Sequence, residues 1–66
     1  MTIKTLGMKV KTLRRARKLT QAALAKKLGV HRVYVAQIEG GTKLPSLAVL
    51  QRLAKVLKVK VQDLLA

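Results

Sequence analysis

Two short helical patterns joined by a single glycine occupy residues 20–39, TQAALAKKLGVHRVYVAQIE. The first pattern runs over Gln21–Leu28 and follows Thr20, a residue type that often caps the start of a helix. Gly29 comes next, where helices commonly end in the left-handed conformation. The second pattern covers Arg32–Glu39. The segment therefore predicts two short helices separated by a tight turn, and this pair constrains the fold more than any other feature.

The segments on either side predict three further helices. Apolar residues spaced i, i+4 and i+7 indicate a helix over residues 6–17, for which Thr5 is the expected N-cap. After the turn residues GGTKLP, Ser46 is expected to cap a helix over residues 47–57. A last helical turn is expected at Val61–Leu65.

The helix predicted over residues 47–57 is apolar around about half of its circumference, whereas a helix on a small core needs only about 100°. Its expected inner stripe consists of Leu47, Leu50, Ala54 and Leu57. The surplus apolar surface of this helix, together with the apolar residues near the end of the chain, predicts a two-fold dimer. The alternative is the ordinary apolar exposure of a small domain. The expected interface residues are Val49, Leu53, Val56, Val59, Val61 and Leu65.

Positive charge dominates the composition. Fifteen Lys and Arg residues oppose two acids, Glu39 and Asp63, which leaves a formal net charge of +13 on 66 residues. Such a surface favours a polyanionic partner over a merely solvated surface, on which acids and bases are normally interspersed. A chain of this length makes one small core, so residues 1–66 are expected to form a single domain with its core over residues 6–65.

Several classes of function are disfavoured by the same composition. Two distant carboxylates, one His and no Cys supply no set of acid, base and nucleophile for an enzyme, and no metal or cofactor site is expected. The start of the chain lacks the apolar run of an export signal, and no apolar stretch is long enough to span a bilayer. A cationic binder of membrane surfaces is disfavoured because the capping and turn residues specify a packed globule. The expected setting is the cytoplasm, in association with the nucleoid.

The helix predicted at residues 32–39 separates into two faces when its residues are placed at about 100° per step. Val35 and Ile38 point one way, and the opposite arc holds Arg32, Val33, Ala36 and Gln37. Arg can bind guanine and Gln can bind adenine in bidentate fashion, while Val can pack on a thymine methyl. This arc is therefore suited to base edges in DNA. The alternatives are that Arg32 only clamps a phosphate and that Gln37 is only solvated.

Three stretches, TQAALAKKLGV, HRVYVAQIEGG and LPSLAVLQRLAKVL, together resemble the helix-turn-helix domain of phage repressors and of the Xre family. The resemblance covers about residues 6–65, and it is specific because several short features occur together at the family's spacings. These features are Leu13-Arg14, Thr20-Gln21, Leu24-Ala25, Leu28-Gly29-Val30, Ile38-Glu39 and Pro45-Ser46-Leu47. The resemblance implies an all-α, compact five-helix, lambda repressor-like DNA-binding domain. Its second and third helices would form the helix-turn-helix, and the third would lie in the major groove.

The resemblance also implies which residues meet DNA bases. The base-contacting positions of the family fall here on Gln21, Arg32, Val33 and Gln37. Similar domains pair the positions of Arg14 and Glu39 in a salt bridge, the alternative being that Glu39 is an incidental exposed carboxylate.

Contacts to the DNA backbone are expected from the amide ends of the second and third helices and from the loop before the fourth. Tyr34 is the only aromatic residue, and it is either a packed ring whose hydroxyl reaches a phosphate or plain core. His31 stands where the family usually has Ser or Thr, so we expect a weaker cap that contacts a phosphate. The full set of backbone candidates is His31, Tyr34, Ala36, Thr42 and Lys43.

The resulting prediction is a sequence-specific regulator of transcription that binds double-stranded DNA and represses as a homodimer on a palindromic operator. Two-fold repressors place their recognition helices about 34–36 Å apart to meet half-sites one helical turn apart. The alternative is an antitoxin of the same family, whose main partner is a toxin protein and whose DNA binding autoregulates its operon.

Overall fold

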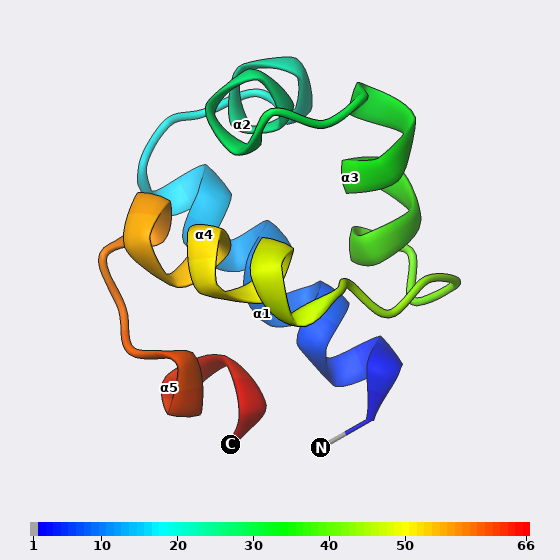
Figure 1. The fold of residues 1–66 in the computed structure, drawn as a ribbon, viewed down its shortest axis with the longest axis vertical. Coiled ribbons are helices and arrows are strands. Elements are labelled where there is room, and N and C mark those ends of the chain that lie inside the picture. The colour runs from blue at the N-terminus through cyan, green and yellow to red at the C-terminus, as the bar shows by residue number, and fades with distance from the viewer. Residues whose placement is uncertain (1) are drawn as a thin grey trace.

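The computed structural model describes residues 2–66, and these form five α-helices. Figure 1 shows α4 passing in front of α1, with α2 and α3 at the opposite end of the molecule from α5 and the two chain termini. This is the all-α, five-helix arrangement that the sequence predicted. No helix within residues 2–66 has both the length and the apolar character needed to cross a membrane. The helices are α1 (Ile3–Ala16), α2 (Gln21–Leu28), α3 (Arg32–Glu39), α4 (Leu47–Leu57) and α5 (Val61–Leu65).

Capping residues define the helix pair and the start of α4 as expected. The Thr20 hydroxyl accepts a hydrogen bond from the Ala23 amide at 3.0 Å, and this begins α2. Gly29 ends α2 with a φ of +72°, a left-handed conformation that glycine adopts without the Cβ clash of other residues. The Ser46 hydroxyl accepts from the Val49 amide at 3.3 Å and begins α4.

The start of α1 differs from the expectation. Thr2, rather than Thr5, is the N-cap, and its hydroxyl accepts from the Thr5 amide at 3.1 Å. The Thr5 hydroxyl is in turn 2.9 Å from the Thr2 amide, which donates to it. The prediction of Thr5 as the cap was wrong because Thr5 serves as the third helical residue of a reciprocal capping box. The helix consequently begins about one turn earlier than predicted.

α4 contributes more buried residues to the core than any other helix, and it packs against α1, α2 and α5. A helix that packs against three neighbours needs apolar residues around much more of its circumference than a helix with one neighbour. This accounts for the wide apolar surface that the sequence showed at residues 47–57. Leu53 is completely buried and Val49 is 7% exposed, so the prediction that these two residues face a second copy was wrong. Leu47, which was expected on the inner stripe, is 67% exposed. The buried residues of α4 are Val49, Leu50, Leu53, Ala54 and Leu57.

A buried glycine brings α1 and α3 into backbone contact. Gly7 lies inside α1, and a Cβ placed on it would collide with the Ile38 carbonyl oxygen and stand 2.8 Å from the Glu39 carbonyl oxygen. Only glycine lets the last turn of α3 rest directly on α1. The position and tilt of α3 therefore depend on Gly7, a constraint that helical periodicity did not reveal.

Replacing Gly7 should test this contact. We expect Gly7→Ala to lower the free energy of unfolding by about 1–3 kcal/mol, since the added methyl overpacks the interface. The intrinsic helix propensity of Ala acts the other way by about 1 kcal/mol, so a stabilised variant would show that α1 and α3 can separate freely. Met8→Ala, on the exposed side of the same helix, is the matched control and should change stability by no more than about 0.5 kcal/mol. Urea denaturation followed by circular dichroism measures both.

Candidate nucleic-acid interface

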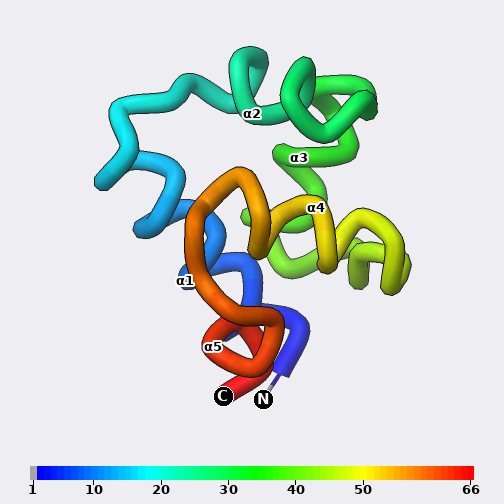
Figure 2. The backbone as a smooth tube through the Cα atoms, turned by 60° about the vertical axis from the view of Figure 1, so that its left-hand side comes forward, coloured from blue at the N-terminus to red at the C-terminus, as the bar shows by residue number. Residues whose placement is uncertain are grey.

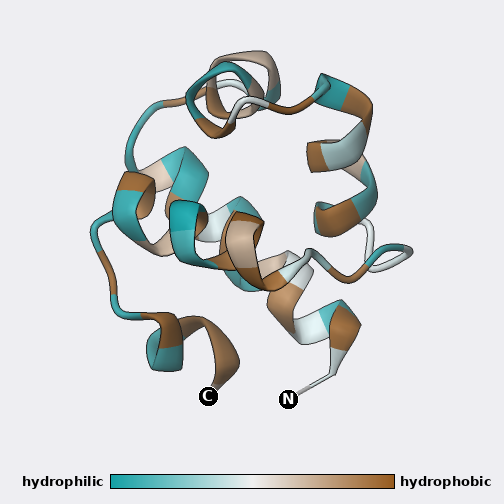
Figure 3. Cartoon of the chain, viewed as in Figure 1, coloured by the Kyte–Doolittle hydropathy of each residue, from teal (hydrophilic) through white to brown (hydrophobic). Residues whose placement is uncertain are grey.

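The two faces predicted for α3 are separated in the structure. Val35 and Ile38 are each 1% exposed and hold the helix to the core. Arg32, Val33 and Gln37 are exposed on the other side. Figure 3 shows α3 at the edge of the molecule, where hydrophobic and hydrophilic segments alternate along its length. An exposed edge helix with a cation, an apolar side chain and an amide can enter a DNA groove without disturbing the core.

His31 caps α3 with its side chain. Its Nδ1 atom accepts a hydrogen bond from the Val33 amide at 3.1 Å. An imidazole whose Nδ1 accepts carries its hydrogen on Nε2 when neutral. The cap therefore leaves an N–H donor at the amide end of α3, the end of a helix that favours anions.

A chain of polar side chains joins the first residue of α2 to the first residue of α3. Gln21 Nε2 donates to Glu39 Oε1 at 3.1 Å, and Arg32 Nη1 donates to Gln21 Oε1 at 3.5 Å. A carboxylate can only accept hydrogen bonds, so Glu39 determines which end of the Gln21 amide faces it. The amide oxygen of Gln21 is thereby turned toward Arg32. The sequence placed both residues at the DNA, but it did not reveal that one orients the other.

The anchor of this chain is a buried ion pair between α1 and α3. Arg14 Nε lies 2.6 Å from Glu39 Oε2, and Arg14 Nη2 lies 3.1 Å from Glu39 Oε1. The third donor group, Nη1, reaches the Leu19 carbonyl oxygen at 2.7 Å. The two side chains are 10% and 3% exposed. The expected pair is thus present, and Glu39 is not an incidental surface carboxylate.

Removing Glu39 should be strongly destabilising. We expect Glu39→Ala to lower the free energy of unfolding by about 3–5 kcal/mol, because Arg14 would keep a buried charge without its partner. Asp63→Asn is the control, since it removes the same formal charge at an exposed position and retains an acceptor for the Lys60 amide. Equal urea midpoints for the two variants would contradict a structural role for the pair.

The loop after α3 is tied to Tyr34. The Tyr34 hydroxyl accepts from the Ser46 amide at 3.3 Å, and the half-buried ring packs against the core. Lys43 Nζ lies 5.2 Å from the ring centroid, within cation–π distance. The Thr42 hydroxyl donates to the Gln37 carbonyl oxygen at 3.2 Å. The Tyr34 ring is thus packed, as both alternatives required, and its hydroxyl accepts one hydrogen bond, whereas Thr42 has already used its single donor.

The other candidate residues differ in what they can offer a ligand. Gln21 and Arg32 are in contact, and Figure 2 shows their helices together at one end of the molecule, away from α5. Ala36 is half-buried and carries no polar side-chain group, so only its methyl can touch a ligand. Among residues 2–66, no group of three or more His, Cys, Asp and Glu side chains is placed to hold a metal ion. At this end of the molecule, the exposed side of α3 and the amide ends beside it are the candidate ligand-binding features.

Comparison with known proteins decides the family. The helix-turn-helix family model matches residues 10–64, which include all of the α2–α3 pair. This chain belongs to the Xre/Cro-CI type of the helix-turn-helix family. Members of this family are DNA-binding regulators of transcription rather than enzymes.

Relatives in the family come from phages, bacteria and archaea. The chain is 42% identical over 57 residues to the immunity repressor protein of Bacillus phage phi105, a match that covers 86% of this chain and 40% of the repressor. It is 45% identical over 56 residues to an uncharacterized HTH-type transcriptional regulator of Methanocaldococcus jannaschii, covering 85% of each. The chain spans only 57% of a second phage phi105 relative, the ImmF control region 10 kDa protein. It therefore corresponds to part of the phage relatives and to most of the archaeal one.

Solved structures show the same fold. The restriction-modification controller protein C.AhdI from Aeromonas hydrophila superposes with a TM-score of 0.88 at 32% identity, over 94% of both chains. The biofilm regulator SinR in complex with DNA superposes with a TM-score of 0.87 at 32% identity, over 92% of this chain and 98% of the chain in that structure. The five-helix arrangement of this chain is thus that of known helix-turn-helix regulators.

Proposed function

We propose that this protein binds a palindromic operator in double-stranded DNA and represses transcription from it. The observation that carries the proposal is the exposed side of α3, whose leading residue Arg32 is held by Gln21, which is itself bound to buried Glu39. Side chains held in place lose less conformational freedom on binding. The resemblance to a phage immunity repressor supports repression as the outcome.

Base recognition in this proposal rests on three exposed residues of α3. Arg32 grips O6 and N7 of a guanine, Gln37 pairs with an adenine, and Val33 covers a thymine methyl. Val33 is 44% exposed, so its methyl groups are available to pack on a thymine methyl. Gln21 contributes its amide oxygen at the base edges and keeps Arg32 in position.

Contacts to the sugar–phosphate backbone come from groups that have a free donor. His31 offers Nε2–H, Tyr34 offers its hydroxyl hydrogen, and Lys43 offers its ammonium group. Thr42 and Ala36, which were also expected here, contribute no free side-chain donor and can contact the backbone only by packing. The net charge of +13 adds a long-range attraction that does not depend on base sequence.

Base recognition and phosphate contact can be separated by two substitutions. Sites are first selected from a random duplex pool at near-physiological salt. On the selected site, Arg32→Ala should weaken the binding free energy by about 1–3 kcal/mol and relax the base preference at one position of the site. Lys43→Ala should weaken binding to all sequences alike and reduce the salt slope by about 0.9 log units per log salt. Fluorescence anisotropy across a salt series measures both, and a wild-type affinity independent of salt would contradict DNA binding altogether.

We propose further that two copies occupy the operator through an apolar surface around α5. Val59 and Val61 are half-buried, and Leu65 is 38% exposed, so apolar atoms of all three residues remain accessible. The like charge of two free copies opposes association. DNA phosphates neutralise that charge, so the operator favours the pair.

Sedimentation velocity at micromolar protein, with and without the selected operator, tests this arrangement. We expect two copies per operator for the wild type and loss of the second copy for Leu65→Lys, because a charge at the interface centre is left unpaired. Thr12→Lys adds the same charge at an exposed site on α1 and should still load two copies. A single copy on a palindromic site would contradict the dimer.

A further inference from the structure

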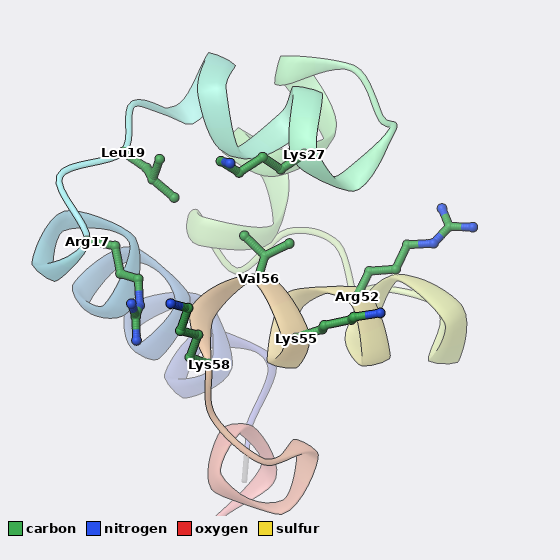
Figure 4. A pocket seen from close by; sticks show the side chains of 7 residues that line it. All are labelled: Arg17, Leu19, Lys27, Arg52, Lys55, Val56 and Lys58. Carbon is green, nitrogen blue, oxygen red and sulfur yellow. The ribbon is translucent and has the colours of Figure 1, made fainter.

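A cleft lies on the molecule away from α3. It has a volume of about 700 Å3 and is formed by the end of α1, the loop after it, α2, α4 and the residue that ends α4. Leu19 and Val56 face the space from opposite sides, and Lys27 extends into it from α2 (Figure 4). No residue of α3 or of the loop that follows it lines the cleft. The lining consists of Arg17, Leu19, Lys27, Arg52, Lys55, Val56 and Lys58.

Among residues 2–66, the cations of this cleft have no acidic partner. The chain has two acids, and both are engaged elsewhere. Glu39 is bound to Arg14 and Gln21, while Asp63 accepts a hydrogen bond from the Lys60 amide at 2.9 Å. A second copy of a chain with a net charge of +13 would be repelled at this site. The occupant that fits is therefore an anionic molecule other than this chain.

Two arginines of the cleft are held by helix ends. Arg17 Nε donates to the Leu57 carbonyl oxygen of α4 at 3.1 Å, and Arg52 Nη1 donates to the Leu28 carbonyl oxygen of α2 at 3.2 Å. Cations at helix C-termini are stabilised by the helix dipole, and this explains why arginines stand there. Each guanidinium has five N–H donors, so most of them remain available to a ligand. Lys27 and Lys55 lie in the last turns of α2 and α4, where the helix dipole also favours cations, and Lys58 is the residue that ends α4.

Lys58 stands in a conformation that normally belongs to glycine. It ends α4 with a φ of +56°, in the left-handed region where a Cβ is unfavourable. Lysine at this position makes the folded state less stable than glycine would. Lys58 belongs to the lining of the cleft, so a ligand-binding role is consistent with its retention at a strained position.

We propose that this cleft docks an acidic protein segment that carries an apolar side chain among its carboxylates. The carboxylates pair with the ring of cations, and the apolar side chain enters between Leu19 and Val56. Duplex DNA matches the charge but offers a polar backbone, with nothing to bury on the apolar floor. Val56, expected at the dimer interface, belongs to this cleft instead. The proposal goes beyond operator binding, because none of the lining residues is used to contact DNA.

Synthetic peptides test the chemistry directly. One short fluorescent peptide has glutamates around a central leucine, and its partner has serine in place of the leucine. At near-physiological salt the leucine peptide should bind about tenfold more tightly, since burying one leucine contributes that much or more. Equal affinity for the two peptides would mean that charge alone attracts them, and it would overturn the proposal.

Neighbouring lysines on α2 supply a matched pair of variants. Lys27 lines the cleft and Lys26 does not, although both are exposed. We expect Lys27→Glu to weaken binding of the leucine peptide at least about tenfold and Lys26→Glu to weaken it less than about threefold. Lys58→Gly relieves the left-handed strain, so this variant should unfold at a higher urea concentration than the wild type. It should nevertheless bind the peptide about two- to threefold more weakly, because it lacks one cation of the cleft. Equal losses for Lys26→Glu and Lys27→Glu would overturn the proposal.

Failure of this proposal can be distinguished from failure of operator binding. Arg32→Ala should leave affinity for the leucine peptide unchanged, and Lys27→Glu should leave the selected operator sequence unchanged. Methyl NMR signals of Leu19 and Val56 report on the cleft itself. If these signals shift when random-sequence duplex DNA is added but not when the leucine peptide is added, the cleft is a second nucleic-acid contact. That result would overturn the docking of an acidic segment.

Discussion

The buried contact between Arg14 and Glu39 joins the parts of this protein that must keep their relative positions. The guanidinium binds the carboxylate with two donors and the Leu19 carbonyl oxygen with a third, so α1, the loop before α2 and the end of α3 meet at one side chain. Gln21 adds α2 to the same carboxylate. In so small a core, a buried charge is tolerated only when hydrogen bonds satisfy it on every side. The same contacts hold α2 and α3 at a constant angle and orient Gln21 toward Arg32.

The large positive charge and the small core oppose each other. Self-repulsion among 15 cations destabilises the compact state, while the same cations favour binding to an anionic partner. Aliphatic packing around α4 and reciprocal capping at α1 stabilise the fold against that repulsion. Specific recognition requires geometry as well as charge, and two places among residues 2–66 combine cations with accessible apolar atoms away from the α5 surface. These are the outer side of α3 and the cleft lined by Leu19 and Val56.

Local chemistry explains where prediction from sequence succeeded. Thr20, Gly29 and Ser46 specify helix ends through bonds to residues within five positions of them, and the predicted bounds of α2, α3 and α4 agree with the structure. The start of α1 was missed because Thr2 and Thr5 are both competent caps, and only their reciprocal hydrogen bonds distinguish them. The sequence predicted the wrong burial for Leu47, Val49 and Leu53, because periodicity cannot tell how many neighbours surround a helix.

The sequence by itself determined the presence of five helices, the caps of α2 and α4, the buried side of α3 and the sign of the charge, since each depends on residue type and short spacing. The tertiary structure alone decided that Gly7 lies against the carbonyl oxygens of α3 and that Gln21 is oriented by Glu39. It also gathered Arg17, Lys27 and Lys58 around one cleft. These relations join residues far apart in the chain, and their distances exist only once the helices have packed. For that reason no local pattern in the sequence encodes them.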